Sequence, residues 1–140
     1  MRILIIGNGG REAAFAKKLS EDSRVTQMFF AKGNATTEKY GKNISLSDIK
    51  DLVDFAKKES IDLTIVGPEA YLVEGIVDEF KKAGLKIFGP DKNAAKLEGS
   101  KAYSKKFMQD YGIKTASGRI FNSYIEAREY LDNQEFPLII

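Results

Sequence analysis

Short apolar runs rich in β-branched residues alternate in this chain with longer segments whose apolar residues recur at helical spacing. The runs predict strands at 3–6, 25–30, 62–66 and 85–88, and the segments predict helices at 11–19, 45–58 and 71–83. Such an alternation favours strand–helix units that build one parallel sheet. The sequence therefore predicts an α/β fold with a Rossmann-like open parallel sheet.

The pattern changes beyond residue 92. Two predicted helices, at 93–97 and 101–111, follow one another, and a strand at 117–121, a helix at 123–131 and a strand at 137–140 come after them. We expect the Rossmann-like domain to span 1–92, a linker to span 93–100, and a second domain to begin in 101–140. A buried apolar strand at a chain end leaves nothing to cover it, so we expect a fragment of a longer protein.

Composition excludes several classes of function. The chain has a formal net charge of +2, so it lacks the basic field of a nucleic-acid-binding protein. It contains no cysteine and no histidine, which excludes disulfides, thiolate nucleophiles and the commonest metal ligands. Any chemistry must therefore use carboxylates, lysine, arginine, backbone amides or a phosphate-carrying cosubstrate. No apolar run has the length of a signal peptide or a membrane span, so we expect a cytoplasmic protein.

The strongest local signal is the run GNGGRE at 7–12, between the first predicted strand and the first predicted helix. Glycines at such a turn let a ligand approach the backbone amides, and the unpaired N–H groups of the helix start favour an anion. Arg11 would add a charge-assisted hydrogen bond, worth about 1.5–3 kcal/mol. The loop predicts a site for one phosphate group, and a tight turn without a ligand is the alternative.

A dinucleotide site is a second interpretation of this loop. The dinucleotide fingerprint requires a third glycine where the chain has Glu12, and an acidic residue at the end of the second strand. That strand ends instead in Phe29-Phe30-Ala31-Lys32. An NAD-binding oxidoreductase domain is therefore disfavoured but stays open, as does a non-catalytic module that senses a phosphorylated metabolite.

Two further predicted strands end in similar turns, Gly67-Pro68-Glu69-Ala70 and Gly89-Pro90-Asp91. Ligands of open α/β sheets bind outside the carboxyl ends of the strands, so we expect both turns beside the glycine loop. Glu69 is predicted to accept hydrogen bonds from ribose hydroxyls or from an amine. The alternative, an acid that only stabilises a helix start, is about as good for Glu69 and better for Asp91.

These motifs, in this order and spacing, resemble the phosphoribosylamine–glycine ligase family of the ATP-grasp superfamily. The resemblance covers the whole chain and is carried by IIGNGGRE at 5–12, GNA at 33–35, IDLTIVGPEA at 61–70, LVEGIVD at 72–78, IFGP at 87–90 and AAKLEGSK at 94–101. Biotin carboxylases and purine carboxylases share the architecture but not this string of motifs. The second domain, over 101–140, would then be the start of an ATP-grasp domain.

The resemblance implies an amide-forming ligation in de novo purine biosynthesis. In the family, ATP phosphorylates the carboxylate of glycine, and the amine of 5-phosphoribosylamine attacks the acyl phosphate to give glycinamide ribonucleotide, ADP and phosphate. The implied cofactors are ATP with Mg²⁺ or Mn²⁺. The implied partners are these small substrates and the remainder of the ATP-grasp polypeptide, with no nucleic acid and no membrane.

The resemblance also assigns candidate site residues. The substrate-binding set is Asn8, Gly9, Gly10, Arg11, Glu12, Gly33, Asn34, Gly67, Pro68 and Glu69. Lys101 resembles the lysine that reaches the nucleotide phosphates, and Lys105 is the second candidate, although both fit a solvated helix face. The catalytic residues, the metal ligands and the glycine site are expected beyond residue 140, so we expect the chain alone to be inactive. The chain departs from the family at Ala13, usually histidine, and at Tyr71, usually proline.

Overall fold

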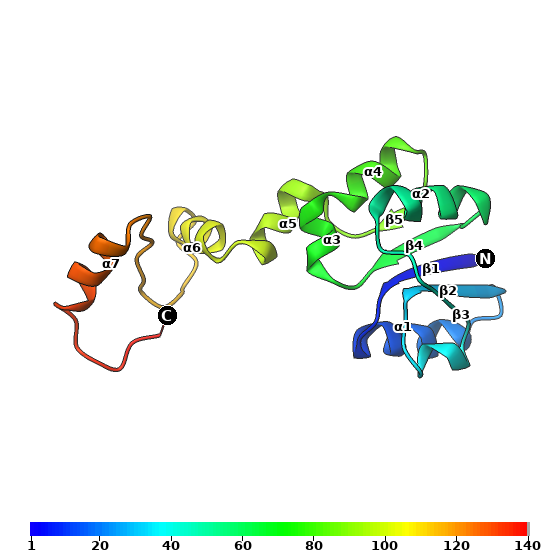
Figure 1. The fold of residues 1–140 in the computed structure, drawn as a ribbon, viewed down its shortest axis with the longest axis horizontal. Coiled ribbons are helices and arrows are strands. Elements are labelled where there is room, and N and C mark those ends of the chain that lie inside the picture. Colours follow the sequence, from blue (N-terminus) through cyan, green and yellow to red (C-terminus); the bar gives the residue numbers. More distant parts are fainter. Residues whose placement is uncertain (140) are drawn as a thin grey trace. The chain divides into compact units, whose positions relative to one another are not determined.

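The computed structural model describes residues 1–139, and the chain divides into two units, Met1–Ser100 and Lys101–Ile140. The first unit is built on one sheet of five strands in the order β3-β2-β1-β4-β5 (Figure 1). The strands are β1 (Arg2–Gly7), β2 (Gln27–Lys32), β3 (Lys42–Ile44), β4 (Leu63–Val66) and β5 (Ile87–Phe88). Every neighbouring pair is parallel, which confirms the predicted Rossmann-like sheet.

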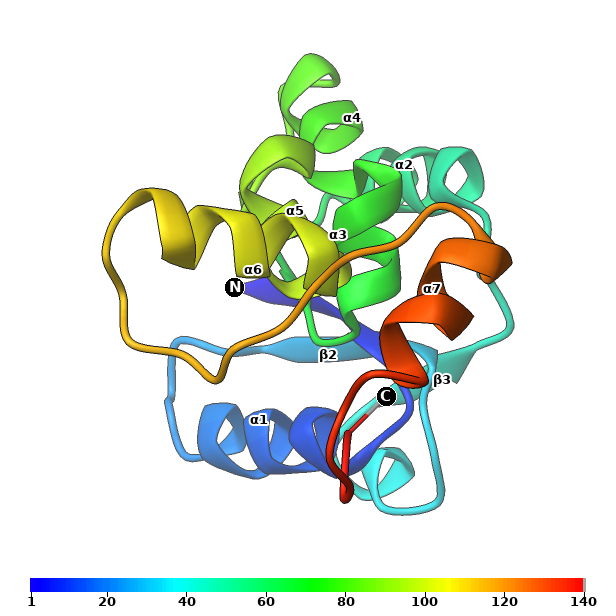
Figure 2. The ribbon, with the colours of Figure 1, turned by 90° about the vertical axis from the view of Figure 1, so that its left-hand side faces the viewer.

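Helices cover both faces of this sheet (Figure 2). On one face, α1 (Gly10–Ser20) packs Ala16 against Ile3 and Ile5 of the central strand. On the other face, α2 (Ile49–Lys58) and α4 (Ile76–Lys82) pack against Leu4 and Ile6. Because alternate residues of β1 enter the two cores, the stretch from Ile3 to Ile6 has to be apolar.

The bounds of β1 and β4 differ from the prediction by one residue at one end or both, and β5 covers only two residues of the predicted 85–88, whereas β2 and β3 differ in ways that the structure explains. β2 begins at Gln27 rather than Val25, because the Val25 N–H donates to the Asp22 carbonyl in the turn that follows α1. It extends to Lys32, two residues beyond the predicted end. The edge strand β3 was not predicted, since it is three residues long and carries the polar side chains of Lys42 and Asn43.

Two helices also differ from the prediction. α2 begins at Ile49 rather than in the segment 45–48, because the Asp48 carboxylate caps it by accepting the N–H groups of Lys50 and Asp51. The segment 71–83 forms two helices instead of one, α3 (Glu69–Glu74) and α4, which are separated at Gly75. Gly75 has φ 100°, a left-handed conformation in which a helix ends.

The first unit is completed by the short 3₁₀ helix η1 (Thr37–Lys39) and by α5 (Lys92–Gly99). The Asp91 carboxylate caps α5 by accepting the Ala94 N–H at 2.9 Å. α5 occupies most of the segment 93–100 that was predicted as a linker, and it packs against α3. The approach is close, because a Cβ on Gly99 would lie 2.2 Å from Cγ2 of Val73.

The second unit contains α6 (Lys101–Asp110) and α7 (Tyr124–Leu131). The predicted strand at 117–121 is wrong, and so is the part of the strand 137–140 that lies within the described residues; residue 140 lies outside them. A strand requires a neighbour that completes its hydrogen bonds, and the described part of this unit contains no such strand. No helix among residues 1–139 is long and apolar enough to cross a membrane.

Candidate ligand site

Three loops meet at the carboxyl edge of the sheet, where β1, β2 and β4 end. The Gly33 N–H, just after β2, donates to the Gly7 carbonyl at 3.1 Å, and the Gly67 N–H, just after β4, donates to the Ile6 carbonyl at 3.0 Å. These bonds hold the loops that follow β2 and β4 against the end of β1. The structure thereby brings together the three sequence segments that were predicted to form the site.

The glycine loop begins where β1 ends, at Gly7, which has φ 127°. Gly9 is the N-cap of α1, and the residues from Asn8 to Arg11 are exposed. The N–H groups of the first helical turn have no acceptor within their own helix and carry the positive end of the helix dipole. The loop therefore presents backbone donors to solvent at the place where a sheet of this kind binds its ligand.

Asn34 holds the glycine loop from the side of β2. Its side-chain amide donates to the carbonyls of Asn8 at 3.0 Å and Gly9 at 3.2 Å. Its own oxygen accepts the N–H groups of Thr36 and Thr37 at 2.8 and 3.1 Å. Asn34 was predicted to bind the substrate. In this structure its side chain instead contacts the backbone of the glycine loop, whose carbonyls turn toward it.

Two residues behind Asn34 were not predicted, Thr37 and Asn43. Thr37 is fully buried, and its hydroxyl accepts the Asn34 N–H at 2.8 Å and lies 2.8 Å from Oδ1 of Asn43. The Asn43 amide donates to the Asn34 carbonyl at 3.0 Å, and a Cβ on Gly33 would lie 2.0 Å from Oδ1 of Asn43. The polar pair Asn34 and Asn43 was visible in the sequence, but its pairing depends on the unpredicted strand β3.

Arg11 and Glu69 form an ion pair between the glycine loop and the β4–α3 turn, with 3.5 Å between Nη2 and Oε2. Their side chains are 65% and 55% exposed, so both can be reached by a ligand. The backbone N–H of Glu69 and, second, the Arg11 guanidinium hold the pKa of the Glu69 carboxyl below its usual range. A cation donor and an ionised acceptor thus stand together at the sheet edge. Pro68, between Gly67 and Glu69, is the N-cap of α3.

Glu12 is the buried member of the predicted set, with 2% of its surface exposed. Oε2 of its carboxylate accepts the Gly9 N–H at 2.6 Å, as the third residue of a helix does in a capping box. A Cβ on Gly67 would lie 1.6 Å from Oε1 of Glu12. The carboxylate therefore fills the space between the glycine loop and the β4–α3 turn.

The two predicted nucleotide-binding lysines belong to α6, in the second unit. Lys101 is exposed at the first residue of the helix. The Lys105 ammonium donates to Oγ1 of Thr115 at 3.0 Å and to the Ala116 carbonyl at 2.5 Å, which ties α6 to the segment after it. Within the described residues, no group of three or more acidic side chains is placed to hold a metal ion.

A parallel sheet with β1 at its centre, and with a glycine turn, an arginine and a carboxylate at its carboxyl edge, defines a Rossmann-like domain with a candidate ligand site. Within that class, residues 1–98 match the family model described as "Phosphoribosylglycinamide synthetase, N domain". The chain belongs to this family, which confirms the family predicted from the sequence motifs.

Individual relatives agree with the family model. The chain is 50% identical over 142 residues to phosphoribosylamine–glycine ligase of Clostridium acetobutylicum, and 51% identical over 142 residues to that of Fusobacterium nucleatum. Both matches cover all of this chain but 34% and 33% of the relative, so the chain spans about a third of their length. The crystal structure of phosphoribosylamine–glycine ligase from Thermotoga maritima superposes with a TM-score of 0.70 at 31% identity, over 96% of this chain and 31% of that one.

Proposed function

We propose that this chain is the N-terminal part of a ligase that joins 5-phosphoribosylamine to glycine and forms glycinamide ribonucleotide, ADP and phosphate in de novo purine biosynthesis. The first unit, Met1–Ser100, binds the phosphoribosyl substrate at the carboxyl edge of its sheet, and the five strands lie within the proposed domain over 1–92. The observation that carries this proposal is the convergence of the glycine loop, Arg11 and Glu69 at that edge. Family membership and the names of the relatives support the choice of this reaction.

The proposed ligation is compatible with a chain that contains no histidine. The Arg11 guanidinium and the amides at the start of α1 bind the phosphate of the substrate. Glu69, which is ionised at neutral pH, accepts hydrogen bonds from the ribose hydroxyls or from the amine. The attacking group is already an amine, so orientation and charge neutralisation provide most of the acceleration.

The nucleotide and the metal depend on the rest of the polypeptide. ATP supplies the phosphoryl group that activates the glycine carboxylate, and the exposed Lys101 is our candidate for contact with its phosphates in an ATP-grasp domain that begins at 101–140. Lys105 is the second candidate, although its ammonium is bound to Thr115 and Ala116. Residues 1–139 offer no acidic cluster for Mg²⁺ or Mn²⁺, so no step is assigned to the metal in this chain. The proposed setting is cytoplasmic.

Calorimetric titration of the chain with ribose 5-phosphate tests the substrate site. We expect Arg11→Ala to weaken binding about tenfold to a hundredfold, because it removes a charge-assisted hydrogen bond to the phosphate. Lys17→Ala is the matched control, since it removes the same charge from an exposed position in the last turn of α1, outside the candidate site, and should leave the affinity unchanged. Equal affinities of the wild type and Arg11→Ala would remove Arg11 from the site. Micromolar binding of NADH would favour the dinucleotide interpretation instead.

A further inference from the structure

Glu12 is the one charged side chain among the buried residues that the structure describes. Only one of its two carboxylate oxygens is satisfied, Oε2 by the Gly9 N–H, and no described residue donates a hydrogen bond to Oε1. Burying a carboxylate with so few partners is unfavourable, so the contacts that the side chain makes have to offset that cost. The residue therefore calls for an explanation at the level of the site.

Three glycines surround this carboxylate. A Cβ would lie 2.6 Å from Cδ of Glu12 if placed on Gly7, 3.1 Å from Oε2 if placed on Gly9, and 1.6 Å from Oε1 if placed on Gly67. Gly7 and Gly9 belong to the glycine loop, whereas Gly67 opens the β4–α3 turn. The Glu12 carboxylate thus lies in contact with both loops, and the glycines make room for it.

The inward position of Glu12 sets the direction of its neighbour. Consecutive residues of a helix point about 100° apart, so when Glu12 points into the protein, Arg11 is turned toward solvent. On the other loop, Glu69 follows two residues after Gly67, which packs on Glu12. The exposed ion pair Arg11–Glu69 and the buried carboxylate therefore join the same two loops, one from outside and one from inside.

We propose that Glu12 is a positioning residue for the phosphoribosyl site, an inference that rests on the proposed function. Its buried carboxylate fixes the Gly9 amide and the spacing of the two loops, and it acts on the ligand through Arg11, Glu69 and the loop backbone. What matters in this role is the reach of the side chain to the Gly9 N–H. Its negative charge matters less, because the side chain is shielded from the solvent side of the loop.

Two conservative variants separate reach from charge. Glu12→Gln keeps the length and an oxygen that accepts the Gly9 N–H, whereas Glu12→Asp keeps the charge but is one methylene too short. We expect Glu12→Gln to bind ribose 5-phosphate within about threefold of the wild type, and Glu12→Asp to bind about tenfold more weakly. Asp54→Asn, which removes an exposed charge on α2, is the control and should bind as the wild type does.

Hydrogen exchange of the Gly9 amide is measured on the same proteins and needs no ligand. We expect this amide to be protected in the wild type and in Glu12→Gln, and to exchange about tenfold faster in Glu12→Asp. The positioning role is overturned if Glu12→Gln loses affinity while Glu12→Asp keeps it, because the ligand would then interact directly with the negative charge of residue 12. It is also overturned if Gly9 exchange is the same in all three proteins.

The two readouts keep this inference separate from the proposed function. If the wild type does not bind ribose 5-phosphate, the phosphoribosyl site fails as a proposal. Gly9 exchange in Glu12→Asp then still decides whether the carboxylate positions the loop. If the wild type binds and both variants bind equally well, the site stands and Glu12 has no part in positioning it.

Discussion

Arg11 and Glu12 are adjacent in the sequence but occupy opposite environments. Arg11 is 65% exposed and faces Glu69 across the sheet edge, whereas Glu12 is 2% exposed and lies against Gly67. One helical step thus separates an exposed cation from a buried carboxylate. At the residue scale, Gly7, Gly9 and Gly67 leave the room that the Glu12 carboxylate occupies.

Gly67 gives the sharpest prediction at this scale. Gly67→Ala would bring a methyl group into the space of the Glu12 carboxylate, and overpacking of this kind costs about 1–3 kcal/mol of unfolding free energy. Gly10→Ala is the matched control, since no atom lies within 4 Å of its Cβ position and alanine favours the helix. Urea denaturation of both variants measures the difference. A Gly67→Ala protein as stable as the wild type would contradict the close packing of Glu12.

At the scale of elements, the break between α3 and α4 shows how one backbone conformation divides a continuous helical pattern. The apolar spacing through 71–83 is that of a single helix, but Gly75 adopts φ 100° and its N–H donates to the carbonyls of Tyr71 and Leu72. The break lets α3 pack against α5 while α4 packs Val77 and Phe80 into the core of the sheet.

The effect of a substitution at Gly75 therefore depends on how readily the new residue adopts a left-handed backbone conformation. Gly75→Ala should lower the unfolding free energy by about 1–2 kcal/mol, because an L-residue with a Cβ is strained in the left-handed region. Gly75→Asn should lose less, since asparagine adopts this conformation more readily. Urea titration followed by circular dichroism compares the two. Equal stability of Gly75→Ala and the wild type would mean that α3 and α4 form one continuous helix.

The sequence predicted best those elements that carry their own signal. β1 and β4 are mostly apolar because both faces are covered, with Arg2 at the start of β1 and Thr64 within β4 as the exceptions, and such runs are recognisable in any context. β3 has no such run and exists because Phe29, Phe30 and Ala31 of β2 provide its hydrogen-bonding partner. The segment 117–121 shows the reverse, since its β-forming residues lie in a unit whose described part offers no strand to pair with.

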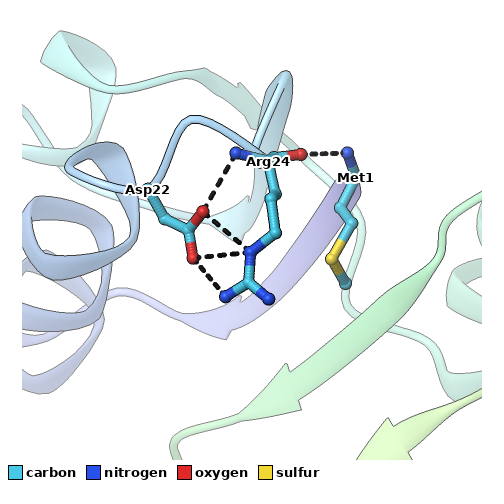
Figure 3. Close-up of polar contacts among 3 residues, drawn as sticks. All are labelled: Met1, Asp22 and Arg24. Atoms are coloured by element: carbon cyan, nitrogen blue, oxygen red, sulfur yellow. Dashed lines mark hydrogen bonds and ion pairs between the residues drawn. The ribbon is translucent and has the colours of Figure 1, made fainter.

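At the scale of the whole first unit, the amino edge of the sheet is tied together by polar contacts, opposite the candidate site. The Arg24 guanidinium binds both carboxylate oxygens of Asp22, and the Arg24 carbonyl accepts a hydrogen bond from the Met1 ammonium (Figure 3). The Thr26 N–H donates to the Met1 carbonyl at 2.9 Å, which places the start of β2 beside the start of β1. The Asp22 turn thus anchors the strand pair at the centre of the sheet.

We expect this turn to make the stability of the unit depend on pH in acid. The Arg24 side chain and then the Arg24 N–H lower the pKa of the Asp22 carboxyl from 3.8 to about 2. Because the folded pKa is depressed, the stabilisation is complete above the unfolded value and is lost as the pH falls from about 4 to about 2. Urea denaturation over this range should show a steeper loss of stability for the wild type than for Asp22→Asn.

Asp54→Asn is the control for the acid experiment, since Asp54 is an exposed acid on α2. It should follow the pH dependence of the wild type. The same dependence in Asp22→Asn and the wild type would show that the Asp22–Arg24 contact does not contribute to folding.

The sequence by itself determined four of the five strands, the alternation of strands and helices, the family, and the three loops that carry the candidate site. These features depend on local residue types and spacing, which every segment carries with it. Only the tertiary structure decided that Glu12 points inward, that Thr37 and Asn43 support Asn34, and that β3 pairs with β2. These features depend on how each helix is rotated against the sheet and on which distant segments become neighbours. Both are set by packing of the whole unit, because a buried polar group or an edge strand is stable only where the rest of the chain supplies its partners.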